Sequence, residues 1–212
     1  MRSLEAWVGV PLGSRADGIH VCHSQARVDE PFNAFVVNQV EKLNSVVITC
    51  IPELLSTFEA LSMQLAVSEL FSEFGIDELR GLLPAKNASA IGTGFSYFLS
   101  AIDDLKQVPH SFPVVNQACA DQLCNFTISV NGQPATTVQT YRRDLSGCVF
   151  LDVQTLEQFR GQGLATAAVF EATRWLLERG FVVRYGAAKS NFPSLLIAKC
   201  LGFTLCSQHI VG

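Results

Sequence analysis

The second half of the chain alternates apolar and polar positions in short runs that predict strands in a clear order. Phe126 to Val130 and Thr136 to Arg142 are rich in β-branched and aromatic residues, and they flank Asn131-Gly132, a strong hairpin signal. Cys148 to Thr155 forms a third, mostly apolar run. We therefore predict an antiparallel hairpin followed by another strand.

A helical pattern begins at Leu164 and is closed by Gly180. Its apolar residues recur at helical spacing opposite a polar stripe, the two sets being Ala165, Val169, Ala172 and Leu176, and Glu171, Arg174 and Glu178. Three further elements are predicted after it: a strand at Phe181 to Tyr185, a helix at Pro193 to Leu201 and a strand at Phe203 to Val211. This order indicates the α/β (α+β) class.

The first half of the chain is less regular. Ala34 to Val37 and Ser45 to Cys50 have β character. Proline suits the first turn of a helix, so we predict a helix from Pro52 to Phe74 that ends at Gly75, and a shorter one from Ile76 to Leu83.

The segment between the two halves indicates a domain boundary. Ser89 to Ser100 mixes glycines with aromatic residues, and its state is left open. Asp103 to Pro113 is polar and contains two prolines, so we expect a linker there. The predicted domains are residues 1–112 and residues 113–212.

Two glycines, Gly161 and Gly163, stand between the third strand and the helix. A strand, a tight turn and a helix N-terminus form an anion site, because the first amide groups of the helix lack partners and the helix dipole favours phosphate. Glycine lets an oxygen approach the backbone closely, and the small side chain of Ala165 leaves the same space open. Arg160 adds a positive charge. The alternative is that the glycines only form a tight turn.

Composition narrows the class of function. The chain has 212 residues, of which 49% are apolar and 16% charged, with a formal net charge of -4. A nucleic-acid surface needs clustered Lys and Arg, so we expect no nucleic-acid partner and favour a small-molecule or protein substrate. No apolar run approaches the roughly 18–20 residues of a membrane span, so we expect no membrane partner. The high apolar share leaves a homodimer open.

The seven cysteines form no CxxC pair and lie in apolar segments, which is typical of reduced thiols. The N-terminal residues lack the pattern of a secretory signal, and we expect a cytoplasmic protein. The glycosylation patterns at Asn87 and Asn125 are then interpreted as chance. His20, Cys22 and His23 lack further ligands at a recognised spacing, so we expect no metal.

The glycine segment Gln158-Phe159-Arg160-Gly161-Gln162-Gly163 resembles the Gln/Arg-x-x-Gly-x-Gly/Ala signature of the GNAT (N-acetyltransferase) superfamily. The downstream residues that the family usually shows are matched by Asn191, Ser194 and Leu201-Gly202-Phe203. More narrowly, the residues around these motifs resemble a bacterial branch that includes zwittermicin-resistance-like proteins. The matching segments are Asp152-Val153-Gln154-Thr155, Gly163-Leu164-Ala165-Thr166, Ala198-Lys199-Cys200-Leu201-Gly202-Phe203 and Gly94-Phe95-Ser96-Tyr97-Phe98-Leu99.

The resemblance implies a mixed, mostly antiparallel sheet with splayed central strands, flanked by helices. Beside it we expect an N-terminal α/β lobe of unclear ancestry that helps to form the acceptor pocket. The splayed strands are Cys148 to Thr155 and Phe181 to Tyr185, with the pantetheine arm of acetyl-CoA in their gap and its pyrophosphate on residues 160–166. The implied acetyl-CoA residues are Val153, Thr155, Gln158, Arg160, Gly161, Gln162, Gly163, Leu164, Ala165, Thr166 and Asn191.

Many family members carry a Tyr general acid where this chain has Ala198. Tyr185 and Ser194 are the nearest hydroxyl-bearing substitutes, although Tyr185 as a packing residue and Ser194 as a helix cap are equally open. Asp152 and Glu157 are the candidate bases. Asp152 interrupts an apolar strand, and the alternative is that it only faces solvent.

The resemblance implies an N-acetyltransferase that moves an acetyl group from acetyl-CoA to a primary amine of a small molecule or peptide. Direct attack is expected, because Cys148 has no histidine near it in sequence that would make it a nucleophile. The alternative is a catalytically silent CoA-binding sensor or partner-binding module, which the absence of the usual Tyr favours.

Overall fold

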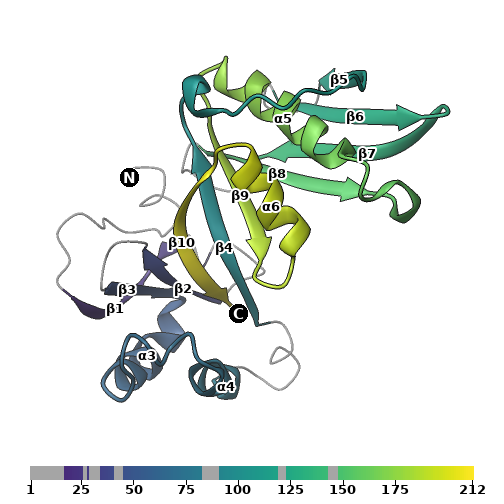
Figure 1. The fold of residues 1–212 in the computed structure, drawn as a ribbon. Coiled ribbons are helices and arrows are strands. Elements are labelled where there is room, and N and C mark those ends of the chain that lie inside the picture. The colour runs from purple at the N-terminus through teal and green to yellow at the C-terminus, as the bar shows by residue number, and fades with distance from the viewer. Residues whose placement is uncertain are drawn as a thin grey trace. The chain divides into compact units, whose positions relative to one another are not determined.

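The computed structural model describes residues 17–25, 28, 34–40, 45–82, 91–118, 123–142 and 148–212. Contacts divide the chain into two compact units (Figure 1). The first unit is Met1–Ser96 with Cys206–Gly212, and the second is Tyr97–Leu205. This division lies earlier than the boundary expected after residue 112, and the last residues of the chain belong to the first unit.

The second unit contains five neighbouring strands in the order β9-β8-β7-β6-β5. Neighbours from β5 to β8 are antiparallel, and β8 and β9 are parallel. The elements are β5 (Val114–Ala118), β6 (Cys124–Val130), β7 (Gln133–Tyr141), β8 (Cys148–Thr155), α5 (Leu164–Leu177), β9 (Val182–Ala188) and α6 (Phe192–Cys200). The predicted order of strands and helices is confirmed, whereas β5 was not predicted.

The hairpin between β6 and β7 turns at the predicted dipeptide. Asn131 has φ 51° and Gly132 has φ 78°, and Val130 pairs with Gln133. Two central residues with positive φ match the twist of the flanking strands, which is why Asn-Gly favours this connection.

Helix α5 covers one face of this sheet, where it packs on β6 and β7 (Figure 1). Phe126 meets Trp175 of α5 with ring centroids 5.9 Å apart, and its register partner Val138 shares that face. Val153 pairs with Val138 and therefore also faces α5. Because side chains alternate along a strand, Asp152 lies on the opposite face.

Strands β8 and β9 separate after a short ladder. Their parallel pairing covers Cys148 with Val182, Val149 with Val183 and Phe150 with Arg184. Both strands continue beyond this point, to Thr155 and Ala188. The predicted splay of the central strands is therefore confirmed, and it leaves a gap between the two strand ends.

The first unit contains four neighbouring strands in the order β1-β3-β2-β10. Its helical elements pack on one face around buried Phe35, Ile48, Phe58, Leu70 and Leu79. The elements are β1 (Gly18–His23), β2 (Phe35–Val40), β3 (Ser45–Cys50), η1 (Pro52–Leu54), α3 (Leu55–Ser62), α4 (Glu73–Gly81), β4 (Gly92–Leu99) and β10 (Thr204–Val211). β4 and β10 contribute residues to both units.

The helix predicted from Pro52 to Phe74 is wrong in its second half, because α3 ends at Ser62 and turns follow. The next helix, α4, begins at Glu73, where the Ser72 hydroxyl caps it by accepting from the Gly75 N–H at 3.2 Å. Gly75 lies inside α4 and does not end a helix. A Cβ there would overlap the Glu69 carbonyl, so a close backbone approach requires this glycine.

The segment left open at Ser89 to Ser100 contains strand β4. The expected linker at Asp103 to Pro113 begins inside the short η3 helix (Ile102–Asp104) and continues as irregular backbone up to β5. Asn87 and Cys119 lie outside the described residues, as do the N-terminal residues before Asp17.

His20 and His23 lie on strand β1, where alternation places them on opposite faces. In the described ranges, no group of three or more His, Cys, Asp or Glu side chains is placed to hold a metal ion. No disulfide joins the six cysteines that the structure describes. None of the described helices is long and apolar enough to cross a membrane.

Candidate functional site

The turn before α5 brings two glycines to the N-terminus of the helix. Gly161 has φ 76° and Gly163, the N-cap residue, has φ 78°. L side chains rarely adopt this conformation, and a Cβ at either position would meet no atom of the described residues within 4 Å. No side chain caps α5 within this described segment, so no side-chain acceptor occupies the first amide groups of the helix. The turn thus provides the donors and the clearance that a phosphate group needs.

Side-chain contacts fix the shape of this turn. Arg160 donates from Nε to the Thr155 carbonyl at 3.4 Å, and the hydroxyls of Thr155 and Thr136 are 2.9 Å apart. Gln162 donates to the Gln158 carbonyl at 3.3 Å. Arg160 is therefore held beside the open amide groups, where its charge adds to the helix dipole.

A groove of about 990 Å³ opens at the turn and runs between β8 and α6. It is lined by residues of the β7–β8 pair, the glycine turn and α6, which are Pro134, Ala135, Thr137, Val153, Gln154, Thr155, Leu156, Phe159, Arg160, Gly161, Gly163, Leu164, Ala165, Thr166, Asn191, Pro193, Ser194, Leu196, Ile197 and Cys200. Nine of the eleven predicted acetyl-CoA residues are in this lining. The exceptions are Gln158 and Gln162, which are exposed on the turn.

Asn191 begins α6, and its side-chain oxygen accepts from the Ser194 N–H at 3.3 Å. Asn191 therefore caps the helix as well as lining the groove. The cap role that the sequence left open for Ser194 belongs to Asn191. Because Asn191 caps the helix, the Ser194 hydroxyl is not the capping group and can contact β9.

That contact is with Tyr185, whose side chain forms a hydrogen bond with Ser194. The Tyr185 side chain is buried, and its ring packs on Phe203 with centroids 5.7 Å apart. Burial raises the pKa of Tyr185 above its ordinary value, the Ser194 hydrogen bond opposes this rise, and the negative charge of Asp152 adds to it. Tyr185 thus interacts with both of the other predicted catalytic residues, Ser194 and Asp152.

These three residues lie on both sides of the gap between β8 and β9. Val183 pairs with Val149, so Tyr185, two residues later, lies on the face covered by α5. Asp152 lies on the other face, opposite Gln139 in the ladder, where it is exposed and accepts from Gln154 at 3.4 Å. The Asp152 carboxylate and the Tyr185 hydroxyl therefore lie on opposite faces of the sheet.

The position of the missing family Tyr is occupied by Ala198, which is fully buried. A large phenol at this site would have to displace packed neighbours, since protein interiors are close-packed. Glu157 lies exposed in the η5 turn (Glu157–Phe159) and does not line the groove. Cys148 is fully buried in the paired part of β8.

The Leu201-Gly202-Phe203 motif holds the segment before β5 against the end of α6. Gly202 has φ 88°, and a Cβ there would overlap the Asp104 carbonyl. Lys106 donates its N–H to the Leu201 carbonyl at 3.1 Å. The glycine of this motif is therefore required by backbone packing rather than by a ligand.

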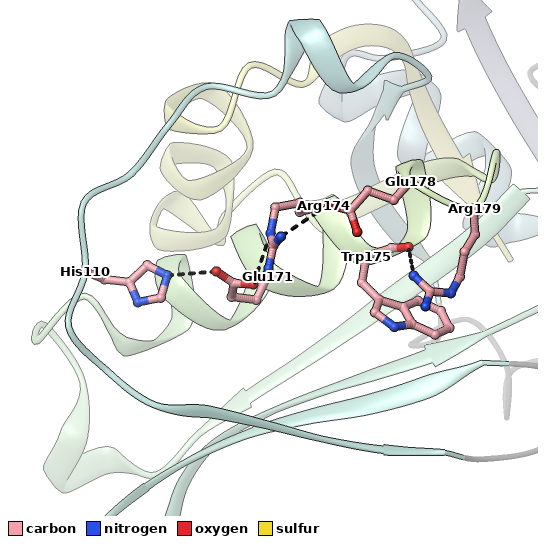
Figure 2. Close-up of polar contacts among 6 residues, drawn as sticks. All are labelled: His110, Glu171, Arg174, Trp175, Glu178 and Arg179. Carbon is pink, nitrogen blue, oxygen red and sulfur yellow. Dashed lines mark hydrogen bonds and ion pairs between the residues drawn. The ribbon is translucent and has the colours of Figure 1, made fainter.

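Figure 2 shows a charged row on the outer face of α5, which lies outside the groove. His110, from the segment before β5, is 3.3 Å from Glu171, and Arg174 bridges Glu171 and Glu178. Arg179 lies over the Trp175 ring at 3.8 Å. Partly exposed pairs of this kind contribute little stability each, and the contact between His110 and Glu171 attaches the segment before β5 to the helix.

Sequence reasoning missed the groove residues that come from other elements, such as Pro134, Thr137, Leu196 and Cys200. Nothing in their local sequence marks them, because only the register of β7 with β8 and the packing of α6 bring them to the groove.

Comparison with solved structures finds partial similarities. A putative GNAT-family acetyltransferase from Novosphingobium aromaticivorans is 15% identical with a TM-score of 0.46, covering 57% of this chain and 63% of that one. A GNAT-family acetyltransferase from Colwellia psychrerythraea is 13% identical with a TM-score of 0.45, covering 57% and 56%. A GCN5-related N-acetyltransferase-like protein from Streptococcus suis is 16% identical with a TM-score of 0.44, covering 81% and 73%. The chain spans about three fifths of the length of the first two.

No curated protein matches the sequence. The model of the acetyltransferase (GNAT) family matches residues 97–203, which is 107 of the 212 residues and includes the glycine turn, the groove and the Leu201-Gly202-Phe203 motif. The protein therefore belongs to the acetyltransferase (GNAT) family.

Proposed function

We propose that this protein is an N-acetyltransferase that moves an acetyl group from acetyl-CoA to a primary amine of a small molecule or peptide. The observation that carries the proposal is the continuous groove from the glycine turn to Ser194, with Tyr185 hydrogen-bonded behind it. Family membership supports acyl transfer in general.

The residues of the groove fit acetyl-CoA, which supplies an acetyl group activated as a thioester. Open space above Gly161 and Gly163 admits the pyrophosphate, the first amide groups of α5 donate to it, and Arg160 adds a positive charge. Leu164, Ala165 and Thr166 belong to this first turn. We assign Val153, Thr155 and Asn191 to the arm of the molecule, because they line the groove between the turn and the gap.

Acid and base are assigned to opposite sides of the gap. The amine nitrogen forms a bond to the thioester carbonyl carbon while the carbon–sulfur bond breaks. Asp152 accepts a proton from the attacking nitrogen on one face, and Tyr185 or Ser194 donates a proton or hydrogen bond to the departing sulfur on the other. Asp152 then releases its proton to solvent, and the hydroxyl that donated takes up a proton from solvent, so both groups return to their starting states.

The state of Tyr185 suits the role of an acid. Burial and the charge of Asp152 raise the pKa of its hydroxyl above the ordinary value of 10.0, so the hydroxyl keeps its proton at neutral pH. A phenol in this state donates and does not act as a base. This assignment explains how the chain dispenses with a Tyr at the position of Ala198.

Calorimetric titration with acetyl-CoA followed by thiol release over a panel of primary amines tests the proposal. Binding together with amine-dependent thiol release is the expected result. Binding without thiol release from any amine would favour the CoA-binding sensor, and absence of binding would contradict both functions.

Three finer assignments belong to this proposal. Membership of the zwittermicin-resistance-like branch is supported by the motif residues of the second unit. A cytoplasmic location is supported by the cysteines in apolar segments, and it predicts seven reactive thiols in freshly denatured protein. A homodimer is supported by the high apolar share of the chain, and light scattering of the purified protein measures it.

A further inference from the structure

The face of the β7–β9 sheet opposite α5 carries an aligned row of two aromatic rings and an arginine. Tyr141 pairs with Phe150, and Phe150 pairs with Arg184. The rings of Tyr141 and Phe150 stack with centroids 5.6 Å apart and an interplanar angle of 18°. The Arg184 guanidinium lies over the Phe150 ring, 4.7 Å from its centroid. This stack fixes the orientation of the arginine.

The Arg184 side chain extends along β9 toward the gap. Its Nη2 atom is 4.0 Å from the place where a Cβ of Gly186 would stand, and among the described residues other than the two chain neighbours it is the only atom within 4 Å of that place. Gly186 is exposed, whereas Arg184 is only 7% exposed. A guanidinium has five N–H donors in a fork, so it can serve more than one partner. Gly186 thus leaves space for an anion next to a fixed cation.

Asp152 lies on β8, on the other side of the gap between the two strands. It lies two residues beyond Phe150 on β8, as Gly186 lies two residues beyond Arg184 on β9, so the two residues hold equivalent positions just past the last pair of the ladder. Asp152 and Gly186 share one face with Phe150 and Arg184. The amine that attacks the thioester therefore meets a carboxylate on one side and a guanidinium on the other.

We propose that the acceptor is an amino acid or an amine that likewise carries a carboxylate. Its ammonium group binds Asp152, its carboxylate binds Arg184 above Gly186, and its nitrogen points into the gap. An uncharged amine leaves Arg184 without this contact, and a diamine places a second cation against it. The proposal rests on the acetyl-transfer function proposed above and names the substrate class of that site.

The test compares free amino acids, each with its own carboxamide, in the thiol-release assay with acetyl-CoA. A charge-assisted hydrogen bond changes affinity by about tenfold or more, so the free acids are expected to show a kcat/KM at least about tenfold higher than their amides. Arg184→Met keeps the length and the apolar contact with Phe150, and it is expected to abolish this preference while acetyl-CoA affinity stays unchanged. Arg184→Lys keeps the charge without the fork and is expected to retain part of the preference.

Arg142→Met is the matched control. Arg142 also lies over an aromatic ring, that of Phe181, at 5.0 Å from the centroid, but it is exposed. This variant is expected to keep the full preference. Gly186→Val is the second test, since it fills the space beside Arg184 without removing a charge and suits a strand. It is expected to weaken use of the free acids, and melting curves verify that each variant is folded.

Equal use of acids and amides by the parent protein, or a preference that persists in Arg184→Met, would overturn the proposal and leave acetyl transfer intact. Absence of thiol release with every amine would contradict the proposed function instead. In that case, calorimetry of amino-acid binding to the CoA-saturated protein decides the acceptor site. Binding that Arg184→Met abolishes supports the site, and absence of binding overturns it.

Discussion

Tyr185 on β9 and Ser194 on α6 form a hydrogen bond between side chains that are nine residues apart in sequence. Ser194 itself lines the groove, so the bond ties a groove residue to the buried Tyr185 on β9. A thioester placed along the groove would bring its sulfur toward this pair. In the mechanism proposed above, this pair would take the place of the phenol that the buried Ala198 excludes.

Removing the hydroxyl that protonates the sulfur is expected to lower kcat by roughly ten- to a thousandfold with acetyl-CoA affinity nearly unchanged, because only the transition state loses an interaction. Tyr185→Phe and Ser194→Ala are compared by thiol release and calorimetry. If pre-steady-state kinetics gives the same rate of the chemical step for both variants and the parent, neither residue takes part in the mechanism.

Replacing Gly163 by Val is expected to abolish acetyl-CoA binding. The new side chain enters the open space before α5. Because the backbone at position 163 has a positive φ, which valine rarely adopts, the substitution also costs about 1–2 kcal/mol of stability. Gly132→Val is the matched control, because Gly132 also has φ 78° with nothing within 4 Å but lies in the β6–β7 hairpin. Calorimetry should show normal binding by this control. A folded Gly163→Val that binds as the parent does would show that the site lies elsewhere.

Stability is expected to fall above pH 9 because of Cys50. Burial, followed by the charges of Cys22 and Glu59, raises the pKa of the Cys50 thiol from 9.0 to about 11. The folded protein therefore holds this proton more tightly than the unfolded chain. The raised pKa of Cys50 contributes roughly 2–3 kcal/mol to the free energy of unfolding. This contribution is complete below pH 9 and is lost as pH rises to about 11.

Urea unfolding at pH 8.5 and 10.5 measures this loss. Cys50→Ala should show a smaller decrease in the free energy of unfolding between the two pH values than the parent. The same decrease in both proteins would mean that other groups cause it.

Gly202→Ala is expected to destabilise the second unit by about 2–4 kcal/mol, since a positive φ and an overlap with the Asp104 carbonyl add together. Gly180→Ala shares the positive φ, at 78°, but meets nothing within 4 Å, and it should cost only the backbone strain. Thermal or urea unfolding compares the two variants. Similar losses in both would exclude the close approach of Asp104 as a cause.

Elements with strong local signals could be predicted from the sequence. β3 and β8 have the predicted bounds, and the Asn131-Gly132 turn has the expected positive φ values. The glycine turn before α5 could also be located, because positive φ favours glycine wherever the rest of the chain lies. These features depend on residues adjacent in sequence, which is why composition and spacing were sufficient.

Other features depend on contacts between distant residues. The sequence predicts that Gly75 ends a helix, yet Gly75 lies inside α4. It is a glycine because the Glu69 carbonyl, which approaches from outside the helix, leaves no room for a Cβ. Strand β1 has no strong pattern of its own and exists through parallel pairing with β3.

The candidate site shows the same division. The sequence alone marked Asp152, Tyr185 and Ser194 as separate possibilities, each with a structural alternative. Their relationship depends on the ladder between β8 and β9 ending at Phe150 and Arg184, and on Asn191 capping α6 so that Ser194 meets Tyr185. The space between Gly186 and Arg184 has no sequence signal, because strand pairing and the stack on Phe150 create it. Backbone preferences act locally and can be read along the chain, whereas pairing and packing join residues that the chain keeps apart.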